Sequence, residues 1–177
     1  MWRRIGIVVG VAAALGFAAF IGLASGPGPA GVPEGTEVVT VDEALHVDGE
    51  VPHDPAVVPA GGAHNAAWLN CGVYDTPVPS ENAVHSLEHG AVWITYSQTM
   101  PADAVETLEG IGSRRDKVIV SPEPDQTVPL RLTAWGFRLD VDDADDSRVE
   151  QFVNEFAGSS SAPEPGALCS GGVGAPN

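Results

Sequence analysis

The stretch that decides the fold is residues 64–96, which read HNAAWLNCGVYDTPVPSENAVHSLEHGAVWITY. Its last part predicts a short helix followed by a strand. Ser80 offers a helix start, Glu81–His89 fits about two turns, and Gly90 is a residue type that commonly follows a helix end. Ala91–Tyr96 is apolar at nearly every position, which is typical of a central strand covered on both faces.

Further elements are predicted on both sides of this stretch. Runs of β-branched residues predict strands, and apolar residues spaced three or four apart predict helices. The expected strands are Thr36–Val41, Lys117–Ser121 and a run from Val128–Trp135 through Phe137–Val141, which forms one long strand with a bulge at Gly136 or two short strands. The expected helices are Pro101–Arg114 and Ser147–Ala157. The segment His46–Gly62 predicts an irregular surface loop. This order indicates an α+β fold, with a small mixed sheet and two or three helices packed on it.

The chain begins with a predicted transmembrane helix. Residues 5–24 carry no charge and are long enough to cross a bilayer. Arg3 and Arg4 predict that residues 1–4 lie in the cytoplasm, so the protein is expected in the cell membrane with a single pass. A Pro/Gly linker, residues 25–34, then leads to an extracytoplasmic globular domain, residues 35–177. A cleaved signal peptide is the alternative, and it leaves the domain outside the cytoplasm as well.

The charge of the chain argues against one class of partner. The formal net charge is −16, and Lys117 is the only lysine. Such a surface repels phosphate backbones, so no nucleic-acid partner is expected. A dense acidic run, residues 140–146, predicts a solvated loop. A calcium site is the alternative, but the run lacks the glycine and the final glutamate of an EF-hand loop.

The two cysteines, Cys71 and Cys169, are expected to form a disulfide. Disulfides are the default for a cysteine pair in an extracytoplasmic domain. A metal-thiolate site and a reactive pair remain alternatives. The chain has no C-x-x-C spacing, so the motif of a thioredoxin-like redox protein is missing.

A histidine cluster is the strongest chemical signal. His85 and His89 are four residues apart, so on a helix they share one face, and Glu88 lies close to that face. With His64 brought in by the fold, they predict a three-histidine site for zinc or copper(II), in which Glu88 is a ligand, a partner of an imidazole or a base. The neighbouring aromatic residues expected to support this site are Trp68, Tyr74 and Trp93, whereas His46 and His53 are expected to be solvated loop residues.

Two other functions fit the same residues. The string HSLEH matches H-x-x-E-H, in which two histidines bind zinc and the glutamate acts as a base, so a zinc hydrolase that uses Glu88 is one alternative. The other is a structural or partner-binding module of the cell envelope without a metal, in which the histidines only form hydrogen bonds. Met1 and Met100 are the only methionines, which disfavours a methionine-rich copper(I) carrier.

Five sequence blocks occur in an order that resembles a known bacterial family. They are Trp68–Val78, Glu81–Tyr96, Ser121–Pro124, Thr133–Gly136 and Ala162–Ala167, the last followed by Cys169. Together they resemble the domain-of-unknown-function family number three-one-zero-five. The resemblance implies a membrane-anchored or exported single domain. It also aligns His64, His85, Glu88 and His89 with motif positions of that family, but it implies no activity.

Overall fold

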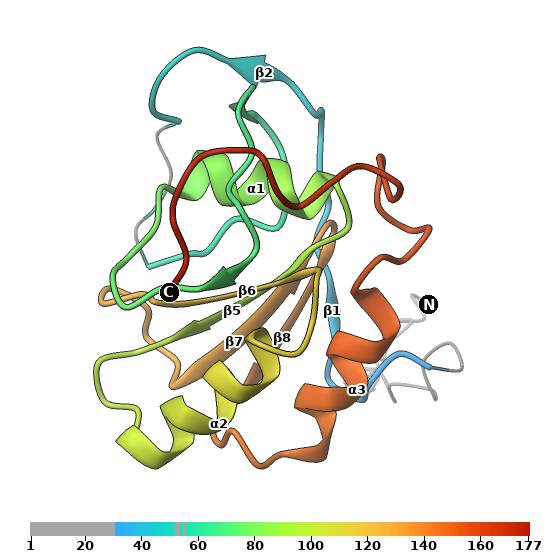
Figure 1. The fold of residues 1–177 in the computed structure, drawn as a ribbon. Helices are drawn as coiled ribbons and strands as arrows, with labels where there is room; N and C mark the ends of the chain where they lie inside the picture. The colour runs from blue at the N-terminus through green and yellow to red at the C-terminus, as the bar shows by residue number, and fades with distance from the viewer. Residues whose placement is uncertain (1–30, 52–53, 55) are drawn as a thin grey trace, which may run out of the picture.

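A mixed sheet forms the centre of the protein in this computed structural model, which describes residues 31–51, 54 and 56–177 (Figure 1). The predicted transmembrane segment, residues 5–24, lies outside the described residues. Within the described residues, no helix is both long enough and apolar enough to span a bilayer.

Six strands make up the sheet in the described part of the chain. Their spatial order is β1 (Glu37–Val38), β8 (Phe137–Val141), β7 (Leu130–Ala134), β5 (Val92–Tyr96), β6 (Val118–Pro122) and β4 (Gly72–Val73). β6 is parallel to both β5 and β4, and the remaining neighbours are antiparallel. A separate short parallel pair joins β2 (His46–Val47) to β3 (His64–Asn65).

The helices lie on both faces of this sheet. α1 (Ser80–Glu88) covers one face, and α2 (Ala102–Gly112) and α3 (Ser147–Phe156) cover the other (Figure 1). α2 connects the parallel strands β5 and β6, as a crossover between parallel strands requires. The result is a three-layer arrangement in which the sheet is buried from both sides.

The central strand β5 shows how the sequence produces these layers. Val92 and Ile94 belong to the apolar core shared with α2 and α3, whereas Trp93 belongs to a second core under α1. All three residues are at most 1% exposed. Alternate residues of a strand point to opposite faces, so an apolar run with no polar face is what a doubly covered strand needs.

The predicted fold class is confirmed as a mixed α+β arrangement, but several strand limits differ. The predicted strand Thr36–Val41 is reduced to β1, which is exposed at the edge of the sheet. The predicted loop His46–Gly62 contains β2. Pro33, which the prediction assigns to the linker, is buried against the domain. Strands of two residues carry too little periodicity to be found from sequence.

The disulfide between Cys71 and Cys169 is present, and it joins the start of β4 to the C-terminal tail. The Cα atoms are 5.3 Å apart and the two residues are separated by 98 positions. Cys71 N–H also donates a hydrogen bond to the Cys169 carbonyl, at 2.8 Å. The covalent link therefore reinforces a backbone contact between distant parts of the chain.

We expect reduction of this disulfide to lower the free energy of unfolding by about 2–5 kcal/mol, because opening so long a loop restores entropy to the unfolded chain. Urea unfolding of the oxidised protein and of the reduced, alkylated protein measures the difference. Equal midpoints would contradict the expectation. Intact-mass analysis of unreduced protein treated with the alkylating agent is the control, and it should show no modified thiol.

Candidate metal centre

Helix α1 carries two of the side chains at the centre, and its position is fixed at both ends. It begins after Pro79 and ends at Glu88, with His89 as its C-cap residue, and the following Gly90 has a φ of 87°, in the left-handed region that favours glycine. Gly90 N–H donates to the Leu87 carbonyl and Ala91 N–H to the Ser86 carbonyl, each at 2.9 Å. This pair of bonds is a Schellman motif, which satisfies carbonyls at the helix end and directs the chain into β5.

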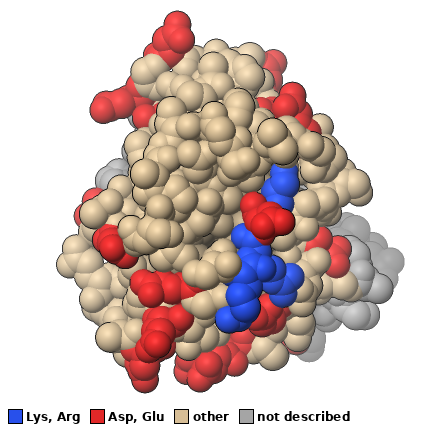
Figure 2. Space-filling view, in the orientation of Figure 1, with Lys and Arg blue, Asp and Glu red and all other residues tan. Residues whose placement is uncertain are grey.

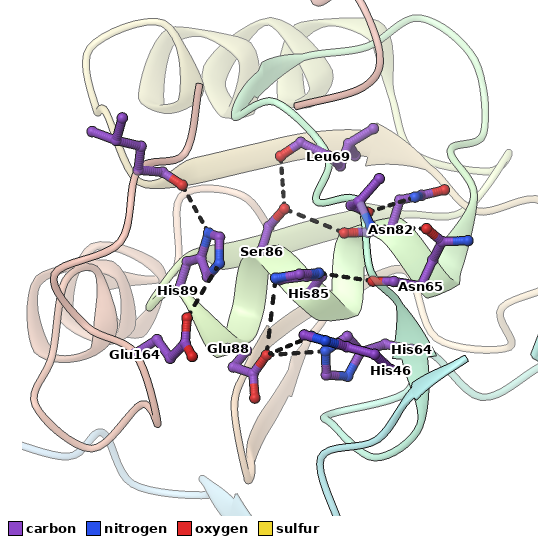
Figure 3. Close-up of polar contacts among 12 residues, drawn as sticks. His46, His64, Asn65, Leu69, Asn82, His85, Ser86, Glu88, His89 and Glu164 are labelled. Atoms are coloured by element: carbon purple, nitrogen blue, oxygen red, sulfur yellow. Dashed lines mark hydrogen bonds and ion pairs between the residues drawn. The ribbon is translucent and has the colours of Figure 1, made fainter. Parts of the chain in front are cut away.

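The segment Asn65–Leu69 runs along α1 and is held by three helix side chains (Figure 3). Its alternate carbonyls accept hydrogen bonds from His85 Nδ1, Asn82 Nδ2 and Ser86 Oγ, at 2.7, 2.6 and 2.7 Å. β3, which carries His64, is thereby fixed against the helix. The outer face of α1 is polar because it binds this segment.

Four side chains converge on one point in front of α1. Glu88 Oε2 lies 3.0 Å from His64 Nε2, 3.6 Å from His46 Nε2 and 4.0 Å from His85 Nε2 (Figure 3). The donor atoms of these four residues all lie within 4.8 Å of one another. The residues come from β2, β3 and α1, and β2 brings His46 directly beside His64 because these two residues are register partners.

Two of the imidazoles have a defined tautomer. His64 Nδ1 contacts the Gly62 carbonyl at 2.8 Å, and His85 Nδ1 contacts the Asn65 carbonyl at 2.7 Å. A carbonyl oxygen only accepts, so each Nδ1 must carry the hydrogen. In the neutral rings, Nε2 therefore carries a lone pair, and this nitrogen points toward Glu88. Fixing Nδ1–H on a carbonyl is the usual way in which proteins orient a metal-binding histidine.

The centre therefore places hydrogen-bond acceptors opposite each other: the Nε2 lone pairs of His64 and His85 face the carboxylate oxygen of Glu88. His64 Nε2 is buried without a hydrogen-bond partner in the described residues, although Glu88 Oε2 is its nearest polar neighbour. Burial lowers the pKa of His85 below its ordinary value, partly offset by the Asn65 carbonyl, and the neighbouring histidines lower it further. The neutral ring is thus favoured there. The converging lone pairs and the carboxylate form a group that could hold a metal ion.

The geometry fits a small transition-metal ion. Ligands about 2.0–2.1 Å from zinc in a tetrahedron are about 3.4 Å from one another. The three distances from Glu88 Oε2 bracket that value. Three imidazole nitrogens and one carboxylate oxygen are a ligand set that suits zinc or copper(II). Both cysteines are in the disulfide, so no thiolate is available.

His89, predicted from the sequence to be a metal ligand, has other partners. Its Nδ1 contacts the Leu168 carbonyl at 2.8 Å, and its Nε2 faces Glu164 at 3.7 Å. It is the C-cap residue of α1, where its ring lies 4.5 Å from the His85 ring, centroid to centroid. His89 thus connects the helix end to the C-terminal tail, and the group of potential ligands has His46 in its place.

The aromatic residues predicted to support the site have different positions. Trp68 packs against the rings of both His85 and His89. Tyr74 and Trp93 lie instead in the core beneath α1, so they support the helix rather than the ligands. Trp135, which the sequence analysis did not single out, meets the His64 ring edge-on at 5.8 Å.

His46 is the residue that sequence reasoning missed. It was expected to be solvated in a loop, and its side chain is indeed 52% exposed, but Nε2 faces Glu88 and the ring stacks on His85 at 4.8 Å. Its signal is the alternation of Leu45, His46 and Val47, which is the pattern of a strand, but surrounding turn residues obscure it. His53 lies outside the described residues.

Comparisons with known proteins place the chain in one family. No curated protein and no solved structure matches it. A family model described as "Protein of unknown function (DUF3105)" matches residues 46–171, a range that begins at His46 and includes the whole centre. The protein therefore belongs to the DUF3105 family, as the five sequence blocks predicted.

Proposed function

We propose that this protein binds a transition-metal ion, zinc or copper(II), through His46, His64, His85 and Glu88. One observation carries the proposal: the buried His64 Nε2 has no hydrogen-bond partner within the described chain and faces a carboxylate oxygen that two further imidazoles also approach. Converging acceptors of this kind repel one another unless a cation lies between them.

A purely structural network is the principal rival. In it, a proton on His64 would form an ion pair with Glu88 and no metal would be needed. That arrangement leaves His85 unexplained. Nδ1 of His85 carries the hydrogen, so its Nε2 would still direct a lone pair at the same oxygen unless the ring were also protonated, and burial disfavours a charged His85.

The hydrolase alternative has less support. The H-x-x-E-H pattern requires both histidines to bind the same ion, whereas His89 Nε2 faces Glu164. Glu88 Oε2 also lies where a fourth ligand would be, which is the place that a zinc-bound water would take. We therefore propose metal carriage or sensing rather than catalysis, in a domain held outside the cytoplasm by residues 5–24.

His85 and His89 form a matched pair for testing the centre. Both are 4% exposed, and each contacts a backbone carbonyl through Nδ1. We expect His85→Ala to lower zinc affinity by at least about 100-fold, because losing even a residue that only orients a ligand costs 10–100-fold. His89→Ala should retain the wild-type affinity. Isothermal titration of chelator-treated protein with zinc and with copper(II) makes the measurement.

The same titration separates the rival functions. If the wild type binds neither ion more tightly than about 10 μM, which corresponds to about −7 kcal/mol, the metal proposal is wrong. If Glu88→Gln keeps the metal and loses a hydrolytic activity that the wild type has, Glu88 is a base and the protein is a hydrolase. If Glu88 is a metal ligand, Glu88→Gln should instead lower the affinity for the metal ion.

Lower pH should weaken both metal binding and the metal-free fold. The pKa of His85 is lowered in the folded state, so below the ordinary histidine pKa of about 6.5 the unfolded chain binds more protons than the folded one. Stability contributed by neutral His85 is therefore present above that pH and lost as the pH falls. Urea unfolding at pH 7.5 and 5.0 measures it, and His85→Gln should show a smaller loss than the wild type. An equal loss in both proteins would refute the assignment to His85.

A further inference from the structure

We propose, on the basis of the proposed metal-binding function, that His46 is the exchangeable ligand through which the ion is transferred to an acceptor. The four ligands differ sharply in exposure. The side chain of His46 is 52% exposed, whereas those of His64, His85 and Glu88 are 0%, 5% and 8% exposed. Within the described part of the chain, the side of His46 is therefore the open approach for an incoming donor.

The three buried ligands are held by the fold. His64 and His85 are fixed through Nδ1 on backbone carbonyls. Glu88 is the last residue of α1, and its own carbonyl accepts a hydrogen bond from Glu164 N–H at 2.9 Å. These contacts fix the rings of His64 and His85 and the backbone of Glu88, so the three ligands are prepared for the ion before it binds.

His46 lies on a segment with few constraints. We call residues 42–50 the His46 segment. None of them is buried, and a Cβ added at Gly49 would meet nothing within 4 Å. Its strand β2 pairs with β3, and the Leu45 carbonyl accepts a bond from His64 N–H at 2.9 Å. The His46 ring faces Glu88 and packs against the rings of His64 and His85. Such segments open locally at low cost in free energy.

The transfer step follows from this difference. The bond between the ion and His46 Nε2 breaks while a bond forms to an imidazole or carboxylate of the acceptor, and His46 leaves as a neutral ring. The ion keeps its charge and its oxidation state. The three fixed ligands hold it until the acceptor supplies further donors, so a free ion is never released.

The charge of the His46 segment indicates the kind of acceptor. The segment carries four exposed acidic residues, Asp42, Glu43, Asp48 and Glu50, and no basic residue. Figure 2 shows acidic side chains at both margins of the end of the molecule where β2 lies in Figure 1. An acceptor protein with a basic face around its own histidine or carboxylate donors would be attracted to it.

A transfer assay tests the proposal. Zinc-loaded protein is mixed with the chromophoric chelator 4-(2-pyridylazo)resorcinol at several concentrations. Because the chelator must attack at His46, the transfer rate should rise in proportion to chelator concentration. His46→Ala should release zinc at least about tenfold faster, since losses of affinity appear mainly in the dissociation rate. A rate independent of chelator concentration would overturn the proposal.

A second variant tests the segment without removing a ligand. Val47 and Asn65 are register partners across β2 and β3. A disulfide between V47C and N65C should slow transfer at least about tenfold relative to the reduced and alkylated form of the same double variant, with zinc affinity measured for both forms. The two single cysteine variants, alkylated, are the matched controls. Unchanged transfer in the cross-linked protein would show that the segment does not move. Absence of zinc and copper(II) binding in the wild type would instead refute the metal site itself.

Discussion

The structure depends on the meeting of three imidazole nitrogens with one carboxylate oxygen at the surface of α1. The contacts around Glu88 Oε2 hold hydrogen-bond acceptors close together. Two backbone carbonyls fix the tautomers of His64 and His85, and burial favours the neutral form of His85. An arrangement that is unfavourable by itself becomes favourable when a cation occupies it, which is why the geometry indicates a metal.

Helix α1 can present these groups because both of its faces are used. Ala83 and Leu87 pack into the core above Trp93, while Asn82, His85 and Ser86 hold the Asn65–Leu69 carbonyls. The C-terminal tail adds contacts at the helix end. Lys117 Nζ donates to the carbonyls of His89 and Ala167, and burial lowers the pKa of this only lysine. Glu88 and His85 on α1, and His64 against it, are therefore anchored to the core beneath the helix.

The sequence predicted the parts of this arrangement that depend on local patterns. Glu81–His89 and Ala91–Tyr96 gave the helix and central strand, because their periodicity and the glycine between them determine local structure. The sequence did not predict His46, because its role depends on a two-residue parallel pairing with β3. His89 illustrates the opposite case. Helical spacing places it near His85, but the end of the helix and the tail carbonyl of Leu168 direct its Nε2 elsewhere.

The position of the disulfide relative to the metal ligands has a topological consequence. The disulfide closes the chain between Cys71 and Cys169, and an ion held by His46 and Glu88 would close it between those residues. Because Cys71 lies between His46 and Glu88 in sequence, the two closed loops overlap, and the part of the chain that they share contains β4 and α1. Neither end of the domain could then peel away while both links held. The loaded protein would be protected kinetically, with slow unfolding and long survival in the presence of proteases.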